Sequence, residues 1–135
     1  MIKKNMVVAG KRKTAVAKAT IKDGNGIVTI NKKPLSSLPV LKKLEASEPI
    51  IIAKDFLGGL NFDIAVSVSG GGIASQIEAS RLAIARAIVK FTKNEELRQE
   101  YLRYDRNMLV ADIRRKEACK PGDSKARSMR QSSKR

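Results

Sequence analysis

The sequence contains no histidine, no tryptophan and only one cysteine, Cys119. Without histidine the chain lacks the commonest general base of enzymes and a frequent metal ligand, so catalytic and metal sites that depend on histidine are excluded. A single cysteine cannot form a disulfide within the chain, which fits a reducing compartment. We interpret Cys119 as a spare thiol.

Long apolar runs are also missing. No stretch approaches the roughly 18 apolar residues that indicate a membrane-spanning helix, and the N-terminal residues lack the apolar run of a signal peptide. The basic C-terminal segment has no apolar face to insert into a membrane either. We therefore expect a cytoplasmic protein without membrane contact.

Acidic residues are scarce. The 135 residues include 28 Lys or Arg against 13 Asp or Glu, which gives a formal net charge of +15. A compact domain with this charge repels itself unless a polyanion is bound. Nucleic acid is the first candidate, an anionic membrane surface the second and an acidic protein the third. Only 4% of the residues are aromatic, so broad base stacking on the protein is not expected.

The length and the 42% hydrophobic content predict one compact body with a modest core. Residues 14–22 alternate between Ala or Ile on one side and Val, Lys or Thr on the other, as in a strand with one buried face. Lys18 and Lys22 lie on the outer side. The DGNG turn at 23–26 predicts that residues 26–31 return beside this strand as a hairpin.

A second strand and two helices are predicted downstream. Residues 61–69 alternate, three glycines follow, and isoleucines at helical spacing mark a helix from Ile73 to Phe91. Asn94 is a predicted cap of another helix. In the proline-rich connector before residue 61 we expect a short helix ending near Pro49, and residues 50–52 remain either strand or helix start. The order indicates an α+β body at 1–104 and an extended basic tail at 105–135.

The glycine-rich stretch VSVSGGGIASQ is the most enzyme-like part of the chain. A strand, glycines and a helix are the layout of a phosphate-binding loop, but Ser75 occupies the third glycine position of G-x-G-x-x-G. Either the glycines permit a tight turn and close packing, or their backbone amides hold an RNA phosphate. Both interpretations stay open. No paired carboxylates or serine–histidine arrangement indicates an enzyme, and we expect no cofactor and no small-molecule substrate.

Two basic clusters are predicted to bind nucleic acid, because counterion release rewards such clusters where phosphates are dense. The first is Lys11, Arg12 and Lys13. The second is spread along the tail and comprises Arg114, Arg115, Lys116, Lys120, Lys125, Arg127 and Arg130. The alternatives are a solvated loop and a solubilising tail. A nucleoid-type compacting protein is the competing function.

Several motifs occur together and in order. GKRKTAVAKATIK, GNGIVTIN, SGGGIASQIEASRLAIARAI, DIRRKE and the terminal KAR…RQSSKR resemble the universal family of small-subunit ribosomal protein number nine. The resemblance covers nearly the whole chain. YDRNMLVADIRRKE is more similar to the archaeal and eukaryotic branch than to the bacterial one.

The resemblance implies a four-stranded sheet with helices packed on one side, in a fold shared with the second domain of another small-subunit ribosomal protein. It implies a structural constituent that binds the 3′ major domain of small-subunit rRNA in the head, beside neighbouring head proteins. The family's RNA-binding positions correspond to Lys11, Arg12 and Lys13, to Gly70, Gly71 and Gly72, and to Arg81 and Arg86.

The resemblance also implies that the tail reaches the peptidyl-site tRNA, with Lys134 and Arg135 at its phosphates. The tail departs from the archaeal pattern at three positions. Lys134 stands where an aromatic residue usually precedes the last Arg, Met129 replaces a basic or small residue, and Asp123 adds an acid.

Overall fold

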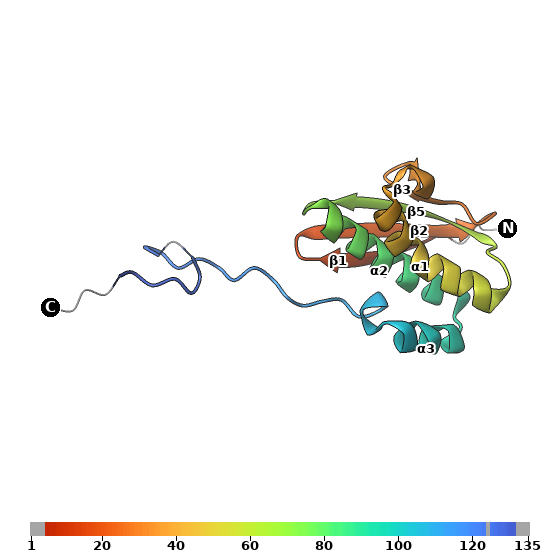
Figure 1. Ribbon diagram of the computed structural model, residues 1–135. Helices are drawn as coiled ribbons and strands as arrows, with labels where there is room; N and C mark the ends of the chain where they lie inside the picture. The colour runs from red at the N-terminus through yellow and green to blue at the C-terminus, as the bar shows by residue number, and fades with distance from the viewer. Residues whose placement is uncertain (1–4, 124, 132–135) are drawn as a thin grey trace.

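The computed structural model describes residues 5–123 and 125–131, and it has a five-stranded sheet with three helices on one face (Figure 1). The strand order across the sheet is β1-β2-β5-β3-β4. The strands are β1 Met6–Arg12, β2 Ala15–Asp23, β3 Val28–Ile30, β4 Lys33–Pro34 and β5 Phe62–Ser69. The helices are α1 Val40–Leu57, α2 Ile73–Thr92 and α3 Glu95–Tyr104, with short 3₁₀ turns at Leu35–Ser37 and Arg106–Met108.

The α+β class and the one-sided helix layer agree with the prediction, but the expected four strands are wrong. The additional edge strand β4 has two residues and pairs antiparallel with β3. Asn31 and Lys32 have positive φ values of 49° and 65°, which turn the chain back sharply along β3. Proline at position 34 fits an edge, since its missing N–H removes no bond from a central ladder.

The predicted hairpin of 14–22 with 26–31 is also wrong, because β5 lies between β2 and β3. β5 pairs antiparallel with β2 and parallel with β3. The DGNG turn forms, but Asp63 of β5 holds it: its carboxylate accepts hydrogen bonds from the backbone N–H groups of Asn25 and Ile27, each at 2.9 Å. The turn therefore wraps around the start of β5 instead of closing a hairpin.

The helix expected to end near Pro49 continues through it to Leu57, so residues 50–52 are helical. Pro49 is buried, and its carbonyl oxygen accepts a hydrogen bond of 2.6 Å from the hydroxyl of Tyr101 in α3. Burial raises the pKa of Tyr101, which keeps that hydroxyl protonated as a donor. Tertiary packing thus outweighs the helix-breaking tendency of proline.

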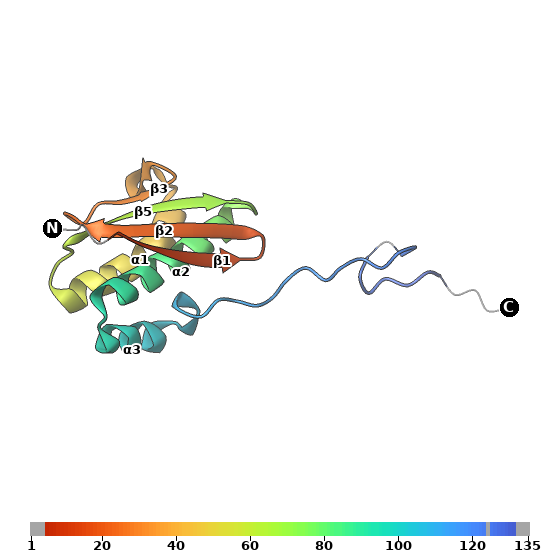
Figure 2. The same cartoon turned by 180° about the vertical axis from the view of Figure 1, so that it is seen from behind.

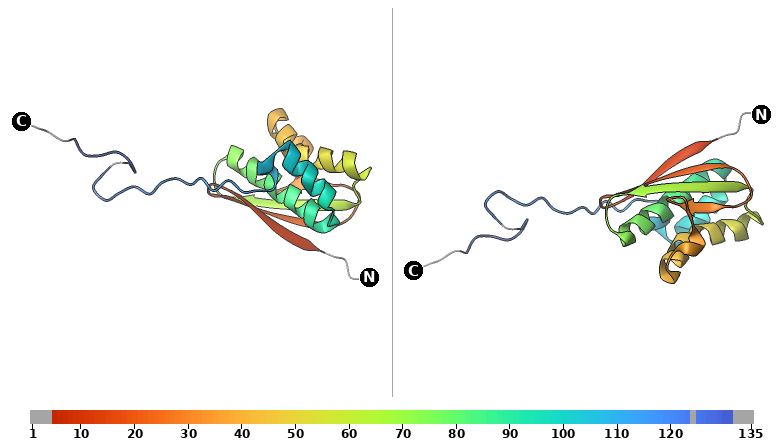
Figure 3. Two further views of the ribbon diagram at one scale, coloured as in Figure 1. Left: turned by 90° about the horizontal axis from the view of Figure 1, so that it is seen from below. Right: turned by 90° about the horizontal axis from the view of Figure 1, so that it is seen from above.

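Asn94 caps α3 as predicted, since its side chain accepts from the N–H groups of Glu96 and Leu97. After Met108 the described chain has no helix or strand, and its later part leads away from the body (Figure 1). The views in Figures 2 and 3 show all three helices on one side of the sheet, with the opposite face open. Burial agrees, because alternate residues of β1, β2 and β5 are buried under the helices and their neighbours are exposed or half-buried.

Small residues let α2 lie close to the sheet. Gly10 of β1 faces α2, where an added Cβ would lie 2.5 Å from the Ala79 carbonyl oxygen and 2.7 Å from the Ala83 nitrogen. Ala15, Ala17 and Ala19 of β2 are fully buried on the same face. This packing brings the backbones of helix and strand together and sets the position of every side chain on α2.

Replacing Gly10 with alanine should therefore destabilise the protein. We expect a loss of about 1–3 kcal/mol in the free energy of unfolding, because the new methyl group meets backbone atoms that cannot move independently. Urea denaturation followed by circular dichroism measures this. Gly59→Ala is the matched control, since nothing lies within 4 Å of a Cβ there. Equal stability of the two variants would contradict the packing argument.

Candidate nucleic-acid interface

The first predicted basic cluster and the start of the second meet at one end of the sheet. A groove of about 550 Å³ runs between the β1–β2 turn and the start of the C-terminal segment. Its lining residues are Arg12, Lys13, Thr14, Arg114, Arg115 and Lys116. The two clusters are separated by about a hundred residues in the sequence. No acidic residue lines this groove. Arg12 and Arg114 are paired with carboxylates beside it, whereas Lys13, Arg115 and Lys116 make no ion pair with any described residue, so these three cations give the groove a positive potential.

The glycine turn after β5 packs against the same end. Gly70 and Gly71 have φ values of 77° and 66°, which favour glycine, and a Cβ on Gly70 would lie 2.6 Å from the Thr14 carbonyl oxygen. Gly72 is the N-cap of α2 and makes no side-chain capping bond. Close packing is thus sufficient to require Gly70 and Gly71. The N-terminus of α2 nevertheless adds a positive dipole end near the basic groove.

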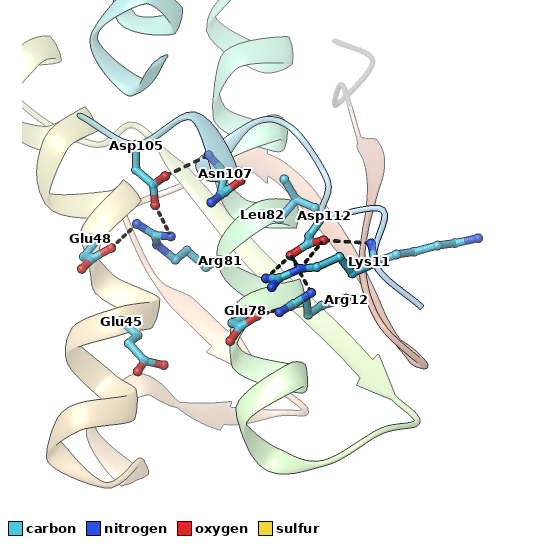
Figure 4. Close-up of a pocket in the computed structure, with 11 residues that line it drawn as sticks. Lys11, Arg12, Glu45, Glu48, Glu78, Arg81, Leu82, Asp105, Asn107 and Asp112 are labelled. Atoms are coloured by element: carbon cyan, nitrogen blue, oxygen red, sulfur yellow. Dashed lines mark hydrogen bonds and ion pairs between the residues drawn. The ribbon is translucent and has the colours of Figure 1, made fainter. Parts of the chain in front are cut away.

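Arg12 and Arg81 occupy a neighbouring cleft of about 380 Å³ and already hold carboxylates (Figure 4). Arg12 contacts Glu78 of α2 and lies 2.7 Å from Asp112. Arg81 bridges Glu48 of α1 and Asp105, the latter at 2.9 Å. Burial opposes the charged form of Arg81, but the two carboxylates outweigh it and raise its pKa. Both arginines therefore tie separate elements together.

The segment after α3 is fastened to the body at further points. Arg86 of α2 donates hydrogen bonds to the carbonyl oxygens of Leu109, at 2.8 Å, and Ala9, at 3.2 Å. Asp112 accepts from the Arg114 guanidinium at 2.7 Å and from its backbone N–H at 2.9 Å. These bonds from Arg114 hold the pKa of Asp112 well below its usual range. Together the contacts determine where the C-terminal segment leaves the body.

Other predicted cations remain available. Lys11, Lys13 and Lys116 are exposed and make no ion pair with any residue that the structure describes, and Lys11 points away from the cleft in Figure 4. Among the described residues, Arg115 donates only to the backbone carbonyl oxygens of Asp112 and Arg114. Lys120 and Lys125 are exposed, while Arg127 pairs with Glu117 and Arg130 with Asp123. Lys134 and Arg135 lie outside the described residues.

Sequence reasoning missed the acidic partners Glu48, Glu78, Asp105 and Asp112. The pairing of Asp112 with Arg114 has a local signal, because the residues are two positions apart. The other partners come from different elements, so only the packing of α1 and α2 brings them together.

Within residues 5–123 and 125–131, no group of three or more His, Cys, Asp or Glu residues is placed to hold a metal ion. No helix in that part of the chain is long and apolar enough to span a membrane.

Comparison with known proteins agrees with a role in the ribosome. The family described as ribosomal protein S9/S16 matches residues 10–135. A small ribosomal subunit protein uS9 of Methanococcus maripaludis is 48% identical over 116 residues, which cover 85% of each chain. The uS9 proteins of Thermoplasma volcanium and Thermoplasma acidophilum are 45% and 48% identical over 129 residues, or 95% of this chain and 96% and 98% of theirs.

These matches define the chain as a ribosomal protein and not as an enzyme. The chain belongs to the ribosomal protein S9/S16 family. The resemblance found in the sequence motifs is thereby confirmed, and the three relatives are archaeal, in keeping with the branch that those motifs favour.

Removing the carboxylate of Asp112 should loosen the start of the C-terminal segment. In Asp112→Asn we expect several-fold faster hydrogen exchange at the amides of residues 112–114, because the bonds from Arg114 weaken. The control is Glu117→Gln, which removes an exposed pair farther along. Unchanged exchange in Asp112→Asn would show that these bonds do not hold the segment.

The bonds between Asp112 and Arg114 should persist in mildly acidic solution. Since the pKa of Asp112 is lowered in the folded protein, its ionised form contributes stability above the ordinary pKa of about 3.9. That contribution is lost only as the pH falls below about 4 and through the lower folded pKa. Exchange protection at residues 112–114 should therefore persist from pH 7 to pH 4. A loss of protection between pH 7 and pH 5 would contradict the assignment.

Proposed function

We propose that this chain is a structural constituent of the small subunit of the cytoplasmic ribosome, where it binds rRNA of the head. The observation that carries the proposal is the groove in which Lys13, Arg115 and Lys116 converge without an acidic lining residue. Family membership supplies the ribosomal setting, and the curated relatives are named as small-subunit proteins.

The groove suits a phosphate of the RNA backbone. Lys13 at the β1–β2 turn and Lys116 on the opposite side approach it from different segments, so a bound phosphate would join the turn to the C-terminal segment. Such contacts neutralise charge and release counterions but carry no base code. We therefore expect the RNA to be recognised at this site by its shape and charge.

Four arginines that were predicted to contact RNA already bind groups inside the protein, and we propose a different role for them. A guanidinium has five N–H donors, and the carboxylates and carbonyls around Arg12, Arg81, Arg86 and Arg114 occupy only some of them. The remaining donors are proposed to reach RNA from a fixed position. The amides at Gly70–Gly72 and the N-terminus of α2 are proposed as a weaker phosphate contact beside them.

The C-terminal segment is proposed to extend the interface. Lys120, Lys125, Arg127 and Arg130 are all exposed along an irregular path, as suits a segment that follows a curved phosphate groove. Lys134 and Arg135 are proposed to contact the peptidyl-site tRNA.

Neighbouring head proteins are proposed to contact α1. Its outward face carries Val40, Leu41, Leu44 and Ile51, each more than half exposed. A helix with apolar side chains on its outer as well as its inner face is usually covered in an assembly.

Removing two cations from the groove should weaken RNA binding. In Lys13→Gln/Lys116→Gln we expect the slope of log affinity against log salt to fall by about two units, because each phosphate contact contributes roughly one. Filter binding to a transcript of the 3′ major domain measures the slope. Lys43→Gln/Lys54→Gln removes the same charge from α1 and should leave the slope nearly unchanged. Equal effects of both pairs would indicate diffuse charge, as in a nucleoid-type protein.

Deleting Lys134 and Arg135 should weaken tRNA binding at the peptidyl site without preventing assembly. The truncated chain should still sediment with small subunits in a sucrose gradient. Those subunits should bind tRNA less tightly, with a salt slope reduced by about one unit per lost phosphate contact. Unchanged tRNA affinity at both low and high salt would refute the tRNA contact.

A further inference from the structure

The face of the sheet opposite the helices is uncovered (Figure 2). On β2 the outward residues are Val16, Lys18, Thr20 and Lys22, and both lysines are exposed. The pairing register aligns Lys18 with Ala9 of β1 and with Ser67 of β5. It likewise places Thr20 between Val7 and Ala65. The centre of this face thus consists of small and hydroxyl side chains around Lys18 and Lys22.

The charge of the face is positive. Asp63 of β5 lies opposite Lys22, and it is the one acid among the outward residues of the strands, all of which lie in the described part of the chain. Its carboxylate is already engaged by the N–H groups of Asn25 and Ile27. Lys18 has no carboxylate within ion-pair distance among the described residues, and Lys11 at the end of β1 adds a third outward cation.

The composition of the face argues against a protein partner. In β1, β2 and β5 the outward apolar side chains of some size are limited to Val7 and Val16, and Ile27 and Pro34 are exposed near the β3–β4 edge. No aromatic residue stands at an outward strand position. Protein interfaces are usually enriched in aromatic residues and depleted in lysine. The missing aromatics also argue against single-stranded nucleic acid, which binds chiefly by stacking its bases.

Double-helical RNA fits this surface better. Lysine and hydroxyl side chains contact phosphates and sugars, and the wide, shallow minor groove of an A-form helix exposes both its 2′-hydroxyl groups and its backbone. Lys18 and Lys22 are four residues apart on one strand, hence about 13 Å, so they would contact different phosphates. The small side chains of Ala9, Ala65 and Ser67 leave room for the backbone to approach closely.

The face is continuous with the basic groove. Lys11 is paired with Val16 at the end of β1, two positions before Lys13 in the turn that lines the groove. One RNA helix lying across β2 would therefore reach the groove at its end.

We propose that the open face of the sheet, centred on Lys18, Lys22, Thr20 and Ser67, is a second RNA-binding surface that docks the sugar–phosphate backbone of double-helical rRNA. The inference rests on the proposed function and adds to it a defined face of the body and a defined form of RNA.

The test compares Lys18→Gln/Lys22→Gln with the same Lys43→Gln/Lys54→Gln control in the full chain. With a transcript of the 3′ major domain, we expect the open-face pair to lower the salt slope by about two units while the control leaves it nearly unchanged. A single-stranded oligonucleotide should show no difference between the two pairs. Should Lys22→Gln disturb the DGNG turn through Asp63, Ser67→Glu tests the same face from β5, where it faces Lys18, and should also weaken binding.

The outcomes separate the two proposals. If the wild-type chain does not bind the transcript, the proposed function fails. If it binds and neither the open-face pair nor Ser67→Glu weakens binding beyond the control, only the second surface is overturned. A dependence seen with the single-stranded probe alone would overturn the double-helix assignment. Protection of Lys18 and Lys22 from acetylation in whole subunits, but not on the transcript, would assign the face to a protein and also overturn it.

Discussion

The close packing of α2 against β1 and β2 is the constraint on which the other features depend. Gly10 and the buried alanines of β2 let the helix approach the sheet at backbone distance. That approach places Glu78 of α2 beside Arg12 at the end of β1. It also places Arg81 beside Glu48 of α1 and Asp105, and Arg86 beside Leu109. A larger residue at position 10 would displace the helix and with it each of these contacts.

The packing also organises the charge of the chain. Four of its few acids, Glu48, Glu78, Asp105 and Asp112, are engaged by arginines at the cleft that Figure 4 shows. Those carboxylates hold helices, sheet and C-terminal segment together. The lysines of the open sheet face, of the groove and of the C-terminal segment make no ion pair with a carboxylate of the described residues. The excess charge is thus concentrated where a polyanion can reach it, and the body remains compact despite carrying it.

The sequence predicts well the features that depend on neighbouring residues. Strict alternation located β2 and β5, helical spacing located α2, and Asn94 was a reliable cap for α3. The pairing between strands that are distant in the sequence could not be predicted from such local patterns. The DGNG turn suggested a local hairpin, whereas Asp63 of β5 holds that turn and separates β2 from β3. Pro49 suggested a helix end, but Tyr101 and the surrounding packing keep the helix continuous.

The candidate site shows the same division. Its basic clusters were visible as runs of charge, and the outward direction of Lys18 and Lys22 followed from alternation. Which arginines are engaged internally depends on β1, α1, α2 and the segment after α3 meeting at one cleft, and no local sequence pattern predicts that. The motifs nevertheless identified the family, because their order along the chain is more specific than any one of them.

A map of the small ribosomal subunit with this chain traced is the most direct test of the account. It should show RNA phosphates in the groove of Lys13 and Lys116 and an RNA helix across Lys18 and Lys22. A groove empty of RNA, with the open face against solvent or another protein, would contradict it.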